Sequence, residues 1–190
     1  MESANKINDQ YLGMMQQSID RMDAIIKDIM ELSRNAQIAS KLVIIEIVTF
    51  VKEIFENLQF INADSYVRLE LKLSDDHLKT DEHLLGTIFS NLLGNAIKYH
   101  DVQKEDRWVR VTMMLVDKTY FISIEDNGSG IENLHLEKIF DMIYRVSSLA
   151  DGTGLGFYIV KEAVTSLNGQ IKVRSKVKEG TKFEIILPAT

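Results

Sequence analysis

The sequence contains no cysteine, which excludes disulfide frameworks, thiolate zinc sites and cysteine nucleophiles together. Proline occurs once, as Pro188, so no proline-rich linker divides the chain. No run of about 18 consecutive apolar residues occurs, and no segment is expected to span a membrane. Positive charge is also scarce, because 22 Lys and Arg against 28 Asp and Glu give a net charge of −6. This balance disfavours a nucleic-acid backbone as the main partner but is compatible with a small anionic ligand held by local cations.

The apolar content is sufficient for a core, and 190 residues correspond to one large domain or to a medium domain with an appendage. Between Tyr11 and Arg34 the apolar residues recur at alternating steps of three and four, at Leu12, Met15, Ile19, Met22, Ile26 and Ile29. This heptad spacing predicts a long amphipathic helix. Such a helix is marginal alone in water, so it needs a partner surface. That surface is either the following domain or, as we favour, a second copy of the helix.

Beyond about residue 37 the pattern changes to mixed helices and strands. Helices are predicted over 46–58, 81–99 and 154–167, and strands over 67–73, 108–116, 120–125, 170–175 and 182–187. Thr80 and Asp81 form an N-cap signal for the second of these helices. The elements predict an α/β fold, a two-layer α/β sandwich preceded by the long amphipathic helix.

The helix predicted over 81–99 carries polar residues beside its apolar stripe. Asn91, Asn95 and Lys98 are spaced i, i+4, i+7 and therefore project from one helix face. Amides and an ammonium group next to a buried stripe are costly unless they meet a ligand or one another. Amide oxygens suit Mg²⁺ and a lysine suits phosphate, but a plain polar surface would show the same residues.

Two glycine-containing segments are further candidates for ligand contacts. Residues 125–131 read Glu-Asp-Asn-Gly-Ser-Gly-Ile after a strand, where Asp126 can accept a hydrogen bond from a base amino group; an ordinary Asx turn is the alternative. Residues 151–156 read Asp-Gly-Thr-Gly-Leu-Gly before a helix, an arrangement suited to phosphate. No Gly-Lys pair is present for a P-loop, and Phe157 stands at the last glycine position of a dinucleotide fingerprint, so neither motif fits.

Four motifs, in this order, resemble those of the sensor histidine kinases. Residues 91–99 resemble the N box of that family, Asp126-x-Gly128-x-Gly130 the G1 box, residues 139–145 the F box and residues 152–156 the G2 box. The run Asp28-Ile29-Met30-Glu31-Leu32-Ser33-Arg34 resembles the end of the second helix in the dimerisation and histidine-phosphotransfer region. The resemblance implies that residues 1–38 belong to that region and that residues 42–190 form a Bergerat-type ATP-binding catalytic domain.

For the nucleoside, the resemblance implies that Asp126 recognises the adenine amino group and that Tyr99 lies along the nucleotide. Thr181 matches a position that supports the adenine pocket. Gly128 and Gly130 would let the backbone approach the base, and Ile131 would be a further nucleotide-binding residue.

For the phosphates, the resemblance implies Asn95 as a ligand of Mg²⁺, with Asn91 and Lys98 nearby. Residues 132–153 would form a mobile lid from which Arg145 reaches the γ-phosphate. Lys98 and Arg145 would thus act in catalysis by positioning phosphate. The residues that would border the phosphates are Gly152, Thr153, Gly154, Leu155 and Gly156.

The sequence departs from the family pattern at two points. The F box usually reads Phe-x-Pro-Phe, whereas residues 140–143 read Phe-Asp-Met-Ile, a change expected to alter lid packing without abolishing ATP binding. None of the four histidines lies on the N-terminal helix, and all are interpreted as solvated or structural: His77, His83, His100 and His135. In the family layout the phosphoacceptor histidine would precede residue 1, so the chain resembles a fragment of a kinase core or a form that acts on another chain.

The implied function is ATP-dependent phosphorylation of a protein histidine, for relay to a response-regulator aspartate. The implied partners are a second copy of the chain, a response regulator and the acceptor histidine of an upstream helix, with no nucleic acid. The implied location is the cytoplasm, either as a free protein or as part of a membrane-anchored receptor. Two alternatives stay open: a non-catalytic signalling module that keeps the fold, and an ATP hydrolase of the Hsp90, MutL or gyrase type. Those hydrolases carry a Glu four residues before the metal-binding Asn, where this chain has Asn91.

Overall fold

The computed structural model describes residues 2–37, 41–61, 66–145 and 152–189, without the side chains of 2–10, 17 and 35–37. The helices are α1 Glu2–Gln37, α2 Ile47–Ile61, α3 Glu82–Lys98, α4 Asn133–Leu136 and α5 Gly156–Ser166. The strands are β1 Leu42–Glu46, β2 Arg68–Leu73, β3 His77–Asp81, β4 Trp108–Val116, β5 Thr119–Asp126, β6 Gln170–Lys176 and β7 Gly180–Pro188.

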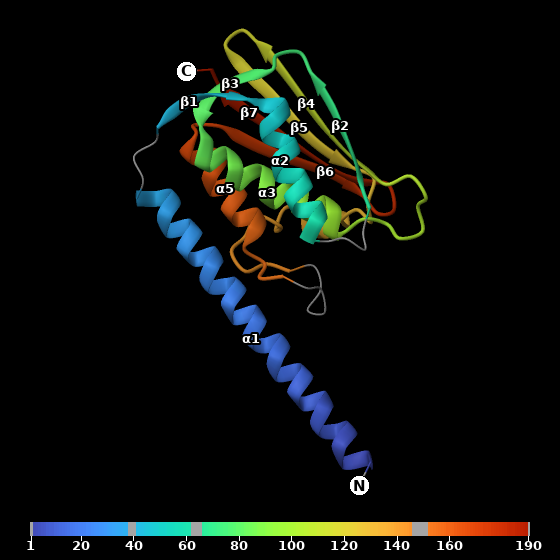
Figure 1. The fold of residues 1–190 in the computed structure, drawn as a ribbon. Coiled ribbons are helices and arrows are strands. Elements are labelled where there is room, and N and C mark those ends of the chain that lie inside the picture. Colours follow the sequence, from blue (N-terminus) through green and yellow to red (C-terminus); the bar gives the residue numbers. More distant parts are fainter. Residues whose placement is uncertain (1, 38–40, 62–65, 146–151, 190) are drawn as a thin grey trace.

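Five of the strands form one mixed sheet in the order β2-β4-β5-β7-β6. β2 and β4 are parallel, and the other neighbours are antiparallel. Helices α2, α3 and α5 cover one face of this sheet (Figure 1). The predicted two-layer α/β architecture, preceded by a long helix, is therefore confirmed.

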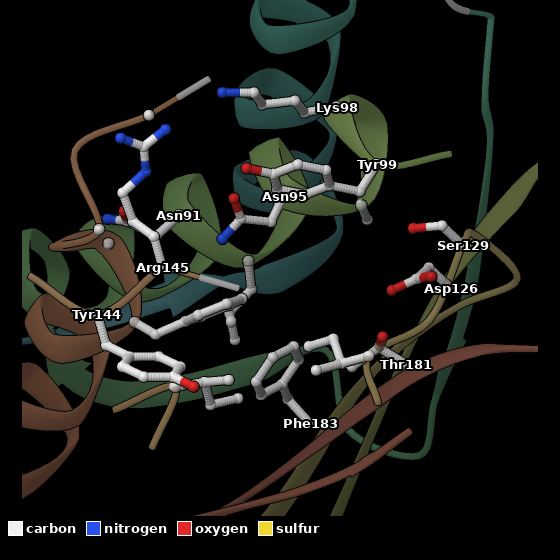
Figure 2. Close-up of a pocket in the computed structure, with 18 of the residues that line it drawn as sticks. Asn91, Asn95, Lys98, Tyr99, Asp126, Ser129, Tyr144, Arg145, Thr181 and Phe183 are labelled. Atoms are coloured by element: carbon white, nitrogen blue, oxygen red, sulfur yellow. The ribbon is translucent and has the colours of Figure 1, made fainter. Parts of the chain in front are cut away.

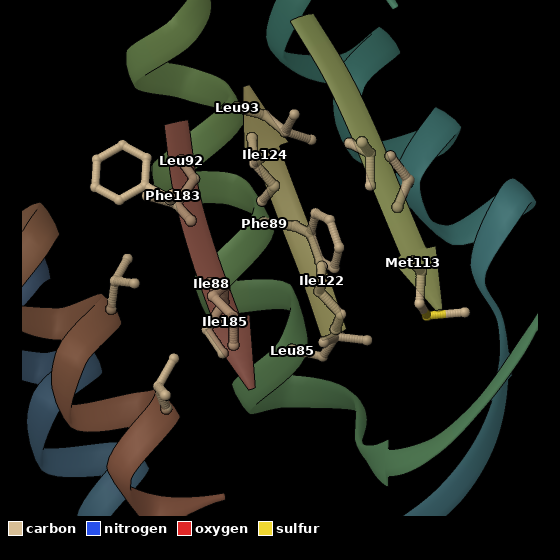
Figure 3. Close-up of a cluster of buried hydrophobic side chains, with 14 of the residues drawn as sticks. Leu85, Ile88, Phe89, Leu92, Leu93, Met113, Ile122, Ile124, Phe183 and Ile185 are labelled. Atoms are coloured by element: carbon tan, nitrogen blue, oxygen red, sulfur yellow. The ribbon is translucent and has the colours of Figure 1, made fainter. Parts of the chain in front are cut away.

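Helix α3 forms the centre of the core because its apolar residues face the middle of the sheet. Asp81 caps the helix, since its Oδ1 accepts a hydrogen bond from the Leu84 backbone N–H at 3.0 Å. The core residues shared between this helix and the strands are Leu85, Ile88, Phe89, Leu92, Leu93, Met113, Ile122, Ile124 and Ile185 (Figure 3). The helix is thus held rigidly against the sheet, which fixes the direction of its remaining faces.

The strand pair β1–β3 was not predicted from the sequence. Residues 42–45 are apolar and directly precede the helix predicted over 46–58, so their pattern did not identify them as a strand. In the structure Glu46 separates the two elements. Its carboxylate oxygens accept hydrogen bonds from the backbone N–H groups of Val48 at 2.9 Å and Thr49 at 2.8 Å, which places the helix start at Ile47. A hydrogen bond with the Thr49 side chain first, and then the backbone bonds from Thr49 and Val48, hold the pKa of Glu46 below its usual value.

Helix α1 extends well beyond the domain in Figure 1. It runs from Glu2 to Gln37 and is therefore longer than the helix predicted over 11–34. Two of its side chains reach the domain: Glu31 accepts a hydrogen bond from the Thr87 hydroxyl at 2.7 Å, and Asp28 accepts one from the Thr153 hydroxyl at 2.5 Å. Its heptad residues are about half exposed or more in the single chain: Leu12, Met15, Ile19, Met22, Ile26 and Ile29. Among the described helices, none is long and apolar enough to cross a membrane.

Leu93 is fully buried in α3, so replacing it tests how far the fold depends on this helix. We expect Leu93→Ala to lower the free energy of unfolding by about 2–5 kcal/mol, because the cavity left behind cannot collapse fully. The same change at Leu134, which is 65% exposed, should alter it by less than about 0.5 kcal/mol. Urea denaturation measures both, and equal effects would contradict the packing described here.

Candidate functional site

A cavity of about 510 Å³ lies between α3 and the segments that follow β5 and precede α5. In Figure 2, Asn91, Asn95, Lys98 and Arg145 surround one end of it, whereas Asp126, Ser129 and Thr181 lie at the other. Leu92, Ala96 and Phe183 provide apolar lining between the two ends. The cavity therefore offers cations and amides at one end and oxygen acceptors at the other.

Helix α3 supplies the polar end because its spacing puts three side chains on one face. The Asn91 amide Nδ2 donates to the Thr87 carbonyl oxygen at 2.9 Å, which leaves Oδ1 directed toward α5. A Cβ at Gly156 would come within 2.8 Å of that oxygen, so a larger residue there would require the Asn91 side chain to shift. The Lys98 ammonium group lies 5.5 Å from the centre of the Tyr99 ring. Amide oxygens of this kind fit Mg²⁺, and the ammonium fits phosphate, so the residues present suit a magnesium nucleotide.

Asp126 ends β5 at the opposite side of the cavity. Burial raises the pKa of its carboxyl group to about 6, although hydrogen bonds from the backbone N–H groups of Gly128 and Thr181 act in the other direction. Its Oδ1 accepts the Gly128 bond at 2.8 Å. A Cβ at Gly128 would lie 2.5 Å from the Tyr99 carbonyl oxygen, which itself accepts a bond from the Ser129 N–H at 3.0 Å. Glycine thus lets the G1 segment dock against the end of α3.

The segment before α5 is shaped by Thr153 and by glycines with positive φ. Gly152 has φ +122° and Gly154 has φ +80°. The Thr153 hydroxyl donates to Asp28 and accepts from the Leu155 backbone N–H at 3.1 Å. Asp28 also lines the cavity, so the N-terminal helix contributes a carboxylate to the polar end of the site.

The structure brings most of the predicted site residues to this one cavity. Those that line it are Asn91, Asn95, Lys98, Tyr99, Asp126, Gly130, Ile131, Arg145, Gly152, Thr153, Gly154, Gly156 and Thr181. Gly128 and Leu155 are buried and do not line it. Part of the predicted lid, residues 146–151, lies outside the described residues. None of the four histidines, all of which are described, lines the cavity.

The sequence patterns missed several lining residues. Phe183 was detectable in principle, because it lies two positions after Thr181 and therefore on the same face of β7. It packs against Phe157, with ring centres 5.1 Å apart, and Phe140 contacts both rings edge-on at 6.4 Å. Phe140 thus anchors the start of the lid although the second Phe of the usual F box is missing. Asp28 carried no such signal, since only the tertiary fold brings α1 to Thr153.

The raised pKa of Asp126 predicts an unusual effect of Asp126→Asn on stability. The folded carboxyl group titrates near pH 6 and the unfolded one near 3.8, so folded Asp126 loses stability as the pH rises through this window. We expect the neutral amide to raise the free energy of unfolding by up to about 3 kcal/mol at neutral pH and to have little effect below about pH 4. Urea denaturation across this pH range measures the difference. Asp23→Asn, at an exposed position, is the control, and a destabilised Asp126→Asn chain at neutral pH would contradict the assignment.

Comparisons with known proteins identify the family. Residues 80–190 match the family model described as histidine kinase-, DNA gyrase B-, and HSP90-like ATPase. A probable C4-dicarboxylate sensor kinase of Bacillus subtilis is 36% identical over 109 residues, which cover 57% of this chain and 20% of the relative. The sensor histidine kinase AtsR of Burkholderia thailandensis is 30% identical over 191 residues, covering 95% of this chain and 31% of the relative. The chain thus spans between a fifth and a third of the length of these curated relatives.

Solved structures agree with this fold. Full-length ShkA in complex with AMPPNP superposes with a TM-score of 0.75 at 22% identity, covering 94% of this chain and 38% of that one. The mycobacterial sensor histidine kinase MprB has a TM-score of 0.66 at 24% identity, covering 78% of this chain and 97% of that one. The resemblance to sensor histidine kinases is confirmed, and the chain belongs to the family of histidine kinase-, DNA gyrase B- and HSP90-like ATPases.

Proposed function

We propose that the cavity binds ATP with Mg²⁺ and that the chain donates the γ-phosphoryl group to a protein histidine. The observation that carries this proposal is the distribution of chemistry along one cavity. A base that bears an amino group fits the acceptors at the Asp126 end, and a polyphosphate fits the amides and cations about Lys98. The complex of the similar ShkA with AMPPNP supports the same ligand class.

At the base end, Asp126 accepts a hydrogen bond from the adenine amino group, and Thr181 lies beside it. The backbone of Gly130 and the side chain of Ile131 border the base. Gly128 shapes the turn without lining the cavity. Phe183 packs against one face of the base, because it lines the cavity next to Thr181. We place Tyr99 along the nucleotide, since its ring lies between the two ends of the cavity in Figure 2. These contacts orient the nucleotide and exclude water from the base.

At the phosphate end, Asn95 holds Mg²⁺ through its amide oxygen, and Asn91 and Lys98 contact the phosphates. Arg145 approaches from the lid side of the cavity (Figure 2). The backbone that borders the phosphates belongs to Gly152, Thr153, Gly154, Leu155 and Gly156. Bound Mg²⁺ supplies charge neutralisation, and the side chains supply position, which is most of what phosphoryl transfer requires.

Transfer to a protein is favoured over hydrolysis because the described lining of the cavity offers no suitable base for water. The related hydrolases use a Glu where this chain has Asn91, and an amide cannot accept a proton from water. Among the described lining residues the carboxylates are Asp28 and Asp126. Asp28 is engaged by Thr153, and Asp126 lies at the far end.

The proposal extends to the partners of the chain. The exposed heptad residues of α1 fit a second copy of the same helix in a dimer, which would leave residues 1–38 and 42–190 as separate functional units. The acceptor histidine then belongs to another helix of the assembly, and a response regulator takes the phosphoryl group onto an aspartate. We propose a cytoplasmic location, where ATP is available.

Binding of ATP tests the two ends of the site separately. We expect Asn95→Ala to weaken Mg²⁺–ATP binding on the order of tenfold or more, because a metal ligand is lost. Asp126→Asn should weaken ATP with or without Mg²⁺, because it acts on the base. Calorimetric titration measures both affinities. Asn57→Ala, on the exposed side of α2, is the matched control, and unchanged affinity in both site variants would defeat the assignment.

Phosphoryl transfer is tested with γ-labelled ATP. The chain alone should acquire no acid-labile phosphohistidine, because none of its four histidines lines the cavity. Added in trans, an acceptor-histidine hairpin from a related sensor kinase should become labelled, and Asn95→Ala should abolish that labelling. Release of inorganic phosphate without any labelled histidine would instead favour the hydrolase alternative.

A further inference from the structure

The hydroxyl group of Ser175 lies at a junction of three segments at the base end of the cavity. Its Oγ donates to the Gly180 carbonyl oxygen at 2.8 Å and accepts from the Ile131 backbone N–H at 2.7 Å. The Thr181 hydroxyl oxygen is a third neighbour, at 2.9 Å. Ser175 on β6 therefore connects the G1 segment to the start of β7.

Counting protons at Ser175 fixes the direction of the third hydrogen bond. A serine hydroxyl has one proton and two lone pairs. The Gly180 carbonyl can only accept, so it takes the proton, and the Ile131 N–H can only donate, so it takes one lone pair. All three contacts are satisfied only if the Thr181 hydroxyl donates its proton to the remaining lone pair of Ser175. Thr181 then has only lone pairs left for the cavity.

Thr181 is 7% exposed and lines the cavity beside Asp126, to which it is paired across β5 and β7. A carboxylate offers acceptors only, and a threonine oriented by Ser175 does the same. Ser129, the other hydroxyl at this end, is exposed and can turn toward water. The buried part of the base end thus accepts hydrogen bonds and donates none from these two side chains.

We infer that Ser175 is a positioning residue that sets base specificity through Thr181. By holding the Thr181 proton away from the ligand, it favours a purine with a 6-amino group, which donates, over one with a 6-oxo group, which accepts. A site that pairs correctly with one group rejects the other, because a buried acceptor facing an acceptor stays unsatisfied. This inference rests on the proposed function, since it assumes that a purine nucleotide occupies the cavity with its 6-substituent, rather than N1, facing Asp126 and Thr181.

The test compares the affinities for ATP and for inosine triphosphate, which has a 6-oxo group, in the chain and in Ser175→Ala. In the variant the Thr181 hydroxyl can rotate and donate to the oxo group. We expect the ratio of the two affinities to fall by about three- to tenfold, the range of one hydrogen bond. Ser175→Thr keeps the hydroxyl and should restore the ratio. Calorimetric titration with Mg²⁺ gives all the affinities.

Two further variants separate orientation from loss of structure. Val173→Ala on the same strand removes partly buried packing without touching the hydroxyl group, and it should leave the ratio unchanged. In a Thr181→Val background, Ser175→Ala should have no further effect on the ratio, because the group it orients is absent. The inference is wrong if the ratio of ATP to inosine triphosphate affinity is unchanged in Ser175→Ala, or if it falls equally in Val173→Ala. Either result would leave the proposal that the cavity binds ATP intact. If the unaltered chain bound neither nucleotide, the proposed function would fall as well.

Discussion

Helix α3 serves the core and the cavity with adjacent faces, and this double use is the constraint on which the site depends. Its apolar face, from Leu85 to Leu93, is seated on the middle of the sheet with almost no exposure. Because a helix turns by a fixed angle per residue, seating one face fixes the direction of the next. Asn91, Asn95 and Lys98 therefore line the cavity together. The Asp81 cap and the packing of Leu93 act on ligand binding through this geometry.

At the opposite end of the cavity the main physical effect is the cost of burying the Asp126 carboxylate. Asp126 is largely withdrawn from water, which raises its pKa to about 6 and makes its charged form unfavourable in the empty protein. A buried acceptor of this kind has most to gain from a ligand that donates a hydrogen bond. The same end holds Thr181, whose hydroxyl oxygen lies 2.9 Å from that of Ser175. The raised pKa of Asp126 thus marks a loss of stability at the proposed recognition site, a pattern common at functional sites.

How far the sequence predicts this arrangement depends on the range of the interactions involved. The Asp81 cap and the spacing of the polar residues on α3 are local, so they could be read directly and the structure shows them. The start of α2 was also predicted to within one residue, but the strand before it was not, because the apolar run at 42–45 is recognisable as a strand only when β1 pairs with β3. Ser175 looks like an ordinary residue of an alternating strand, and its role appears only when three distant segments meet. Asp28 is a similar case, since it meets Thr153 across 125 positions of sequence.

The central claim is that one cavity holds the base at Asp126 and the phosphates at α3. The most direct measurement is a crystal structure of the chain with Mg²⁺ and a non-hydrolysable ATP analogue. The account predicts the adenine amino group within hydrogen-bond distance of the Asp126 carboxylate and the metal on the Asn95 amide oxygen. A nucleotide bound in the reverse direction, bound elsewhere, or not bound at millimolar concentration would contradict it.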